Sequence, residues 1–335
     1  MSLFVTGAAG FIGSEFVRNL VESSYEFNIT SFDLLTYAGN LENLSGISND
    51  GFSFIKGDIR NRENVLAAIP FDCDGIINFA AESHVDRSIE SAHDFITTNI
   101  LGTQVLLDCA REKRVKRFLQ VSTDEVFGSL PSDPGSFFTE ESPYAPNSPY
   151  AASKTSAEHF VRAAHETFGL DTVITRCGNN YGYRQFPEKL IPLMISNALN
   201  DEPLPLYGDG QNVRDWIFVA DHCDAIWQVF ENGNSGESYN IGARNQRTNI
   251  EVVNTILDIL GKPKTLIKPV ADRLGHDRRY AIDPTKIETE LGWKPKISWT
   301  EGIQKSIDWY LSNSEWLEKV KSGEYMEYYR RQYNG

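Results

Sequence analysis

Side chains that can move protons are concentrated in two short segments of the chain. The run Thr123-Asp124-Glu125 directly follows an apolar segment, and Tyr150 and Lys154 lie beyond the next loop. A hydroxyl, two carboxyls, a phenol and an ammonium that share one pocket can carry out acid–base chemistry around a redox step. The rest of the chain would then have to supply a redox cofactor and a substrate with protons to exchange.

The elements that would position these groups alternate short β-rich runs with helical patterns, which is typical of a parallel doubly wound sheet. Strands are expected at residues 3–6, 29–33, 52–56, 75–79, 118–122 and 172–176, and helices at 11–22, 62–69, 94–114 and 150–168. In such sheets, ligands bind outside the carboxyl ends of the strands. The run Thr123-Asp124-Glu125 lies in a loop of this kind.

The pattern changes after residue 176 to longer loops, frequent prolines and isolated helices, which we expect at 191–199, 221–231, 250–260 and 300–311. We therefore predict a Rossmann-like α/β fold with a doubly wound parallel sheet and a smaller C-terminal α/β cap. Residues 1–180 would form the dinucleotide-binding domain and residues 181–335 the substrate-binding domain. Some crossing of the chain between the two is expected.

Composition narrows the classes of partner and location. No apolar run approaches the ~20 residues that span a bilayer, and no secretory signal is evident because a strand pattern begins at once. The four cysteines share no metal-like spacing, so we expect free thiols in a cytoplasmic protein without a metal site. A net charge of −14 disfavours nucleic acid as a partner. An anionic ligand would need a local cationic pocket.

Three glycines between the first strand and the first helix predict a dinucleotide site. Gly7, Gly10 and Gly13 would permit a tight turn and a close approach of backbone N–H groups to a pyrophosphate. This spacing also occurs in purely structural turns. Asp33, at the end of the second strand, favours the cofactor because a carboxylate there accepts hydrogen bonds from the adenosine ribose and repels a 2′-phosphate. NAD is therefore predicted rather than NADP.

The next two strand ends would add cofactor contacts. Asp58 and Ile59 could cover the adenine, although a simple strand-end cap explains Asp58 equally well. The small side chains of Ala80, Ala81 and Ser83 would let the central part of the cofactor pass close to the fourth strand.

The spacing of Tyr150 and Lys154 places both side chains on one face of a helix. A phenol has a pKa near ~10 in water, but a neighbouring ammonium and a positive nicotinamide both favour the phenolate. Tyr150 would then act as a base for a sugar hydroxyl, while Lys154 lowers its pKa and holds the nicotinamide ribose. The Tyr-x-x-x-Lys motif is common by chance. Its catalytic interpretation therefore depends on its position after a dinucleotide-binding fold.

These motifs together resemble those of the extended short-chain dehydrogenases/reductases, and in particular the dTDP-glucose 4,6-dehydratase family. The resemblance covers Thr6 to about Asp283. It rests on residues 6–13, 35–40, 80–88, 122–128, 150–154, 179–182, 186–192 and 275–277. The Asp124-Glu125 pair and the Glu-Lys-Leu-Ile-Pro run at residues 188–192 are its most selective parts.

The resemblance implies a mechanism in which Tyr150 takes the C4 hydroxyl proton of a nucleotide sugar while hydride passes to NAD. Glu125 would then remove the C5 proton and Asp124 would protonate the departing C6 hydroxyl. Return of the hydride to C6 and of a proton to C5 gives a 4-keto-6-deoxy sugar with no net consumption of NAD. Thr123 would orient the sugar through its C4 oxygen. Since two close carboxyls cannot both ionise cheaply, one of the two pKa values should rise.

The resemblance also implies the binding residues. NAD would contact Gly7, Gly10, Phe11, Ile12, Gly13, Asp33, Leu34, Leu35, Thr36, Asp58, Ile59, Phe79, Ala80, Ala81, Ser83, Thr98, Tyr150, Lys154 and Asn180. The nucleotide sugar would contact Ser83, Thr123, Asp124, Glu125, Asn179, Glu188, Lys189, Leu190, Pro205, Leu206, Tyr207, Arg214, Asn249, Asp272, Arg273 and His276. Helices 94–114 and 150–168 resemble those that form a four-helix homodimer interface in this superfamily, although their apolar residues could equally serve only the core.

Some residues depart from the usual pattern of the family. Phe127 stands where many members carry Tyr, Tyr183-Arg184 replaces Pro-Tyr, and Leu274 replaces a frequent Pro. These departures leave the proton-transfer residues intact. They do not determine whether the nucleotide of the substrate is dTDP, UDP, CDP or GDP.

Two other functions share part of this pattern. A 4-epimerase or decarboxylase of the same fold would also use NAD, Tyr150 and Lys154, but an epimerase has no use for the Asp124-Glu125 pair. A non-catalytic NAD-binding regulator would bind the cofactor but would have no need for an intact set of proton-transfer residues.

Overall fold

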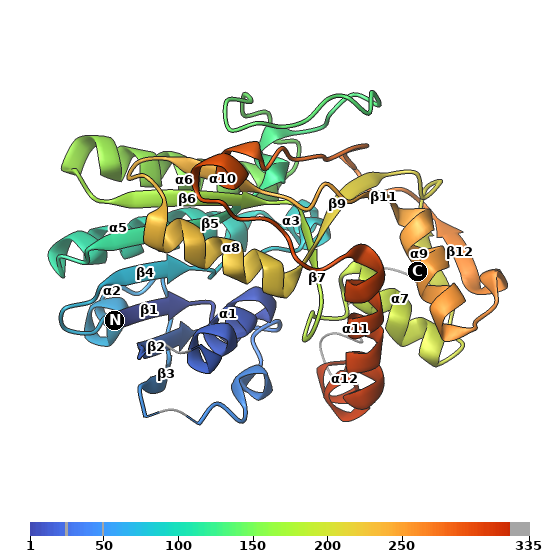
Figure 1. Cartoon of the computed structure of the whole chain (residues 1–335), viewed down its shortest axis with the longest axis horizontal. Helices are drawn as coiled ribbons and strands as arrows, with labels where there is room; N and C mark the ends of the chain where they lie inside the picture. The colour runs from blue at the N-terminus through green and yellow to red at the C-terminus, as the bar shows by residue number, and fades with distance from the viewer. Residues whose placement is uncertain (24–25, 49, 322–335) are drawn as a thin grey trace.

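A computed structural model describes residues 1–23, 26–48 and 50–321 of the chain. The larger lobe contains the N-terminus and a central sheet, and the smaller lobe is built mostly from the second half of the chain (Figure 1). None of the helices in the described part is long and apolar enough to cross a membrane.

The central sheet has seven strands in the order β10-β6-β5-β4-β1-β2-β3. All neighbouring strands run parallel. They are β1 (Ser2–Thr6), β2 (Asn28–Asp33), β3 (Phe52–Lys56), β4 (Gly75–Asn78), β5 (Arg117–Thr123), β6 (Thr172–Cys177) and β10 (Ser238–Ile241). The first six confirm the sequence prediction. We did not predict β10, because its four residues gain a strand pattern only by pairing with β6.

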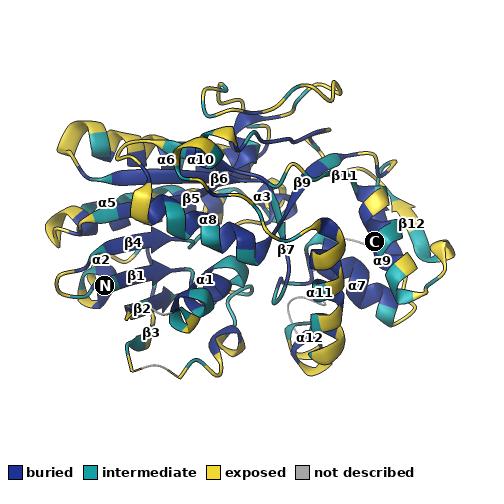
Figure 2. Cartoon of the chain, viewed as in Figure 1, coloured by how far each residue is buried: buried dark blue, intermediate teal, exposed yellow. Residues whose placement is uncertain are grey.

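Helices cover both faces of this sheet. In front in Figure 1 lie α1 (Phe11–Glu22) and α8 (Val219–Asn232). The other face carries α2 (Arg62–Ala68), α5 (Thr103–Glu112) and α6 (Pro149–Phe168). Successive side chains of β1 enter different cores, since Val5 packs with Phe16 of α1 whereas Phe4 packs with Leu106 of α5. The inner strands β1, β4, β5 and β6 are therefore buried on both sides (Figure 2), whereas the edge strand β3 is partly exposed.

The helix predicted over residues 94–114 is divided. It consists of α4 (His93–Phe95), a π-helical segment η2 (Ile96–Gly102) and α5. Within η2, the Asn99 amide accepts from the Glu82 N–H and donates to the Glu82 carbonyl, both at 2.9 Å, and donates to Ser153 Oγ at 2.8 Å. The Asn99 side chain thereby links the loop after β4 to α6. This tertiary contact cannot be inferred from helical periodicity, which is why the break in the helix was not predicted.

The smaller lobe has its own core, formed by helices and two small sheets. Its helices are α7 (Leu190–Leu199), α9 (Asn249–Leu260), α11 (Trp299–Ser312) and α12 (Ser314–Val320). Its sheets join β7 (Asn179–Tyr181), β9 (Val213–Phe218) and β11 (Gln246–Thr248), and β8 (Leu204–Tyr207) with β12 (Ile267–Val270). The remaining elements are η1 (Leu41–Leu44), α3 (Val85–Glu90), η3 (Asp124–Phe127), η4 (Lys264–Leu266) and α10 (Thr285–Glu290).

Three segments of the second half of the chain return to the central sheet. These are α8, β10 and α10, which contacts β10. The domain division at residue 180 stays a prediction. All four cysteines are free and buried, as expected.

Candidate active site

A cavity of about 470 Å³ opens at the carboxyl ends of the central strands, where the two lobes meet. It is lined by all five proton-transfer residues and by every predicted cofactor residue except Leu35. Groups from β1, β2, β4, β5, α6 and the segment after β6 therefore share one space, as the strand-end rule anticipates.

Gly7, in the turn after β1, and Gly13, in the first turn of α1, have no room for a side chain. A Cβ on Gly7 would lie 2.5 Å from the Ala80 nitrogen, and Gly7 has a φ of +67°. A Cβ on Gly13 would lie 2.2 Å from the Gly7 oxygen. The bare backbone leads directly into the N-terminus of α1, where a pyrophosphate is stabilised by N–H groups and the helix dipole. This cradle fits a dinucleotide.

Replacing Gly7 with Ala is therefore expected to weaken NAD binding by roughly tenfold or more, measured by calorimetry. Gly46→Ala is the matched control, because Gly46 has a similar φ of +75° but nothing within 4 Å of an added Cβ. Both variants should lose about 1–2 kcal/mol of folding free energy from the left-handed backbone, and Gly7→Ala should lose more because its Cβ also meets the backbone of Ala80. Equal NAD affinities in the two variants would contradict the assignment of the cradle.

The carboxylate of Asp33 is held rigidly at the end of β2. Its Oδ2 accepts from the Ala9 N–H at 2.9 Å and its Oδ1 from the Leu35 N–H at 2.8 Å. Burial raises the pKa of Asp33, and these two hydrogen bonds oppose the rise. Leu35, with a φ of +59°, orients Asp33 through its backbone, whereas we had expected it to contact NAD.

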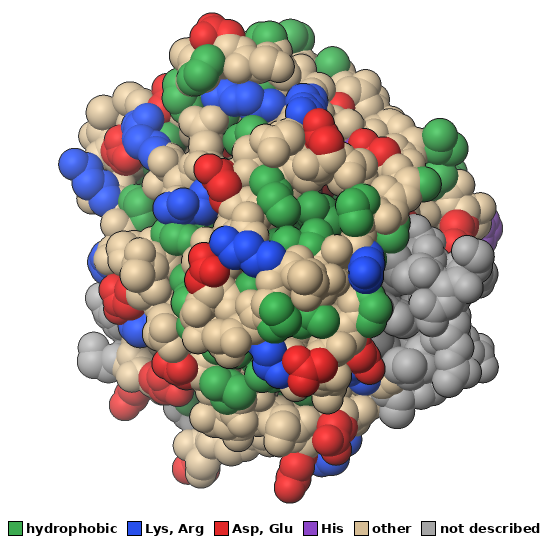
Figure 3. All heavy atoms as spheres, turned by 90° about the vertical axis from the view of Figure 1, so that its right-hand side faces the viewer, with side chains coloured by type: hydrophobic (Ala, Val, Ile, Leu, Met, Phe, Trp, Pro, Cys, Tyr) green, Lys and Arg blue, Asp and Glu red, His purple; other side chains and the backbone are tan. Residues whose placement is uncertain are grey.

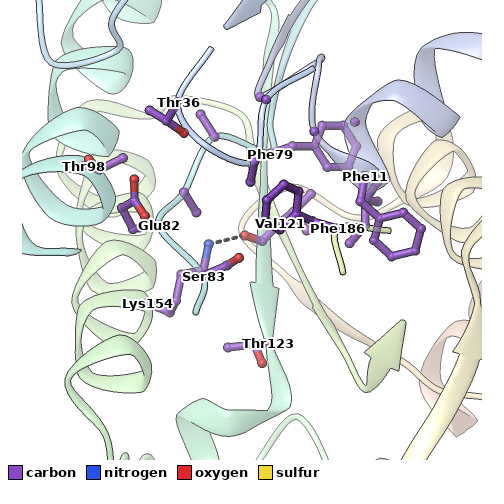
Figure 4. Close-up of a pocket in the computed structure, with 18 of the residues that line it drawn as sticks. Phe11, Thr36, Phe79, Glu82, Ser83, Thr98, Val121, Thr123, Lys154 and Phe186 are labelled. Carbon is purple, nitrogen blue, oxygen red and sulfur yellow. Dashed lines mark hydrogen bonds between the residues drawn. The ribbon is translucent and has the colours of Figure 1, made fainter. Parts of the chain in front are cut away.

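The catalytic side chains lie around the end of β5. Lys154 Nζ donates to the Val121 carbonyl at 2.7 Å (Figure 4). Thr123 caps the short helix η3, since its Oγ1 accepts from the Glu125 N–H at 3.3 Å and lies 3.5 Å from Asp124 Oδ1. The strand end and its cap thus bring the hydroxyl and both carboxyls to one side of the cavity.

The two carboxyls have different electrostatic surroundings. Burial, followed by the charge of Glu125, raises the pKa of Asp124 well above its usual value, and Asp124 Oδ2 accepts no hydrogen bond from the described residues. Burial also raises the pKa of Glu125. Arg214 opposes the rise at both carboxyls, and Arg273 and Lys189 oppose it further at Glu125. Asp124 is therefore the group more readily protonated and Glu125 the one more readily ionised, as an acid and a base require.

The pKa of Tyr150 differs in direction from the sequence expectation. Burial and then the Glu125 carboxylate raise it well above its usual value, while a hydrogen bond with Thr123 opposes the rise. Burial also lowers the pKa of Lys154, to about 8. The protein's own charges keep Tyr150 protonated, so the phenolate requires further positive charge in the cavity.

The predicted substrate residues fall into two groups. Ser83, Asn179, Glu188 and Lys189 line the cavity with the catalytic residues. The others do not line it: Leu190, Pro205, Leu206, Tyr207, Arg214, Asn249, Asp272, Arg273 and His276.

Part of the second group gathers around Asp86 of α3. Its Oδ2 accepts from Tyr207 Oη at 3.0 Å, and its Oδ1 pairs with Arg273 Nη1 at 3.4 Å. His276 Nδ1 lies 2.5 Å from Asp272 Oδ1, and its ring meets that of Tyr207 edge-on. Charged side chains of both signs are interspersed over the outer face of the smaller lobe (Figure 3). The chain as a whole carries a net charge of −14. The cations near Glu125 are therefore gathered locally and do not reflect the overall charge of the protein.

Glu188 also joins the two lobes at the cavity. Its Oε1 accepts from Tyr37 Oη at 3.2 Å, and its Oε2 lies 3.4 Å from Arg87 Nε. The Arg87 guanidinium lies 3.9 Å from the centre of the Tyr37 ring. Lys189 Nζ donates to the Ser83 carbonyl at 2.8 Å. The selective run at 188–192 therefore fastens the second half of the chain to the loops after β2 and β4.

Several cavity residues were not in the sequence prediction. They include Arg60, Glu82, Asp94, Cys177, Gly178, Gln185 and Phe186. Glu82 and Phe186 lie inside motifs that carried the resemblance, and both point toward the cavity in Figure 4. Cys177-Gly178 follows β6, so the strand-end rule could have found it. Arg60 and Asp94 have no comparable sequence signal. No group of potential metal ligands occurs among the described residues.

Comparison with known proteins connects this site to characterised enzymes. The family profile described as GDP-mannose 4,6 dehydratase matches residues 4–306. The chain is 48% identical to a dTDP-glucose 4,6-dehydratase of Escherichia coli over 100% of this chain and 99% of that one. It is 50% identical to that of Xanthomonas campestris pv. campestris over 96% of each.

Solved structures agree with these relatives. A dTDP-glucose 4,6-dehydratase from Streptomyces venezuelae with NAD bound superposes with a TM-score of 0.92 at 48% identity, covering 96% of this chain and 100% of that one. A UDP-glucose 4-epimerase from Thermus thermophilus in complex with NAD is more distant, with a TM-score of 0.86 at 31% identity over 93% and 100% of the two chains. The chain therefore belongs to the dTDP-glucose 4,6-dehydratases, within the extended short-chain dehydrogenases/reductases.

Proposed function

We propose that this protein is an NAD-dependent dTDP-glucose 4,6-dehydratase, a lyase that converts dTDP-glucose to dTDP-4-keto-6-deoxyglucose and water. The observation that carries the proposal is the Asp124-Glu125 pair, whose members differ in their tendency to ionise. The pair shares a cavity with Tyr150, Lys154 and a dinucleotide cradle. An epimerase would not need this pair of carboxyls.

Each catalytic residue has a defined task in this proposal. Tyr150 takes the proton of the C4 hydroxyl, which Thr123 orients, and Lys154 holds the nicotinamide ribose. Bound NAD supplies the hydride acceptor at C4, the donor that later reduces C6, and a positive charge that favours the Tyr150 phenolate. Glu125 removes the C5 proton made acidic by the C4 ketone, and Asp124 donates a proton to the departing C6 hydroxyl. A proton returns to C5 as the hydride returns to C6, so the net change is the loss of one water.

The test is incubation of the purified protein and NAD with dTDP-, UDP-, CDP- and GDP-glucose in separate reactions. We expect dTDP-glucose to lose one water by mass spectrometry, with a reducible ketone in the product, and the other three to react more slowly. An isomer of unchanged mass would identify an epimerase instead. Unchanged sugars in all four reactions would overturn the proposal.

We further propose a cytoplasmic homodimer that forms through η2, α5 and α6. These helices pack against one another, and they leave large apolar side chains exposed: Ile96 at 53%, Leu101 at 50% and Phe160 at 41%. Exposed apolar side chains on adjoining helices are typical of an interface. Four buried free thiols are in keeping with a reducing compartment.

The double variant Leu101→Arg/Phe160→Arg should be monomeric in size-exclusion chromatography with light scattering, because charged side chains would have to be buried unpaired. Phe71→Arg is the control, since Phe71 is 92% exposed outside these helices. A double variant that elutes as the same dimer as the control would contradict this interface.

A further inference from the structure

A carboxylate lies on the same buried helix face as the two catalytic residues of α6. Tyr150, Lys154 and Glu158 follow one another at i, i+4 and i+8, so their side chains stack along one side of the helix. Lys154 is 5% exposed and Glu158 is 1% exposed. Charges buried this deeply are costly unless other groups compensate them.

Glu158 is held by donors from two other segments of the chain. Its Oε2 accepts from Arg176 Nε at 2.9 Å, from Arg176 Nη2 at 2.7 Å and from Tyr144 Oη at 2.8 Å. Arg176 lies on β6 and also donates to Ser238 Oγ of β10 at 3.0 Å. Because a guanidinium stays protonated at any physiological pH, this pairing sets a permanent positive charge against the Glu158 side chain and fixes its position.

The buried ammonium of Lys154 needs a negative charge nearby to compensate for its burial. The only acceptor of its ammonium among the described residues is the neutral Val121 carbonyl at 2.7 Å, and burial lowers its pKa to about 8. The group that opposes this fall most strongly is Glu158. A group with a pKa so close to neutrality changes its charge when one neighbour is lost.

Other ionisable groups also surround the cavity near Lys154. They are Tyr150 on α6, Asp94 on α4, Asp124 and Glu125 on η3, and Cys177 on β6. Tyr150 is neutral, and the pKa of the Cys177 thiol is raised by burial to about 12. The carboxylate that raises the pKa of Lys154 is that of Glu158.

We propose that Glu158 is a positioning residue for the redox step, acting as the buried counter-ion of Lys154, and that Arg176 and Tyr144 hold it in place. This inference rests on the proposed function, because Lys154 is assigned to the redox step there. Glu158 acts through Lys154 and does not line the cavity.

The test is Glu158→Gln, which keeps the size and hydrogen-bonding capacity of the side chain but removes its charge. We expect the alkaline limb of the kcat/KM pH profile to move to lower pH by about one unit, so the loss of activity grows from pH 6.5 to pH 9. Competitive acetylation of Lys154, followed by peptide mass spectrometry without NAD or substrate, should show the same shift in its titration. Glu158→Asp, which retains the charge, should restore much of the wild-type profile.

A second variant separates the loss of Glu158 from the exposure of an unpaired Arg176. Glu158→Gln/Arg176→Gln removes both charges, a change that buried ion pairs often tolerate, and it should keep the acidic shift of Lys154. A wild-type Lys154 titration in Glu158→Gln, or its return in the double variant, would overturn the inference. A wild-type enzyme that dehydrates no sugar nucleotide would overturn the proposed function instead, while leaving the acetylation result interpretable.

Discussion

Glu125→Gln is expected to stop the loss of water while C4 oxidation continues, so that reduced cofactor accumulates on the enzyme after dTDP-glucose is added. The amide cannot take the C5 proton, and general-base catalysis contributes about 10²–10⁴-fold. Among the charged groups that raise the pKa of Tyr150, Glu125 also has the largest effect. Its neutralisation should ease phenolate formation, so the oxidation step should not slow.

Stopped-flow absorbance of the reduced nicotinamide, combined with mass spectrometry of the sugar, measures both steps. Glu141→Gln is the control, because Glu141 is an exposed carboxylate outside the cavity. It should behave as the wild type. A Glu125→Gln enzyme that releases the dehydrated sugar at the wild-type rate would assign the C5 proton to another base.

Tyr150→Phe should block the reaction one step earlier, with no reduced cofactor formed and a loss of roughly 10²–10⁴-fold in kcat. The phenol lies in a buried position beside Thr123, and the substitution removes only its hydroxyl. NAD affinity should stay close to that of the wild type, since the cradle at Gly7 and Asp33 is unchanged. Binding of NAD and of dTDP-glucose is measured by calorimetry, and cofactor reduction by absorbance.

Tyr183→Phe provides the comparison, because Tyr183 is partly buried against the core of the smaller lobe and does not line the cavity. It should reduce NAD at the wild-type rate. Substantial cofactor reduction in Tyr150→Phe would show that another group takes the C4 hydroxyl proton, and Thr123 would be the first residue to test.

The larger lobe was predictable to a high degree. Its strands and helices follow from local patterns, and the rule that ligands bind at the carboxyl ends of parallel strands placed the glycine turn, Asp33, the end of β5 and the start of α6 together. The β10 strand, the π-helical break at Asn99 and the small sheets of the second lobe were not predicted. Each depends on a partner far away in the sequence.

The identities and spacing of Asp124, Glu125, Tyr150 and Lys154, together with the glycine turn, were enough to predict NAD-linked dehydratase chemistry from the sequence. The tertiary structure alone decided how these groups ionise. Burial makes Tyr150 a weaker acid, distant cations distinguish Glu125 from Asp124, and Glu158 supports the charge of Lys154. A pKa depends on solvent exclusion and on charges brought close by folding, and neither quantity can be read from the spacing of residues along the chain.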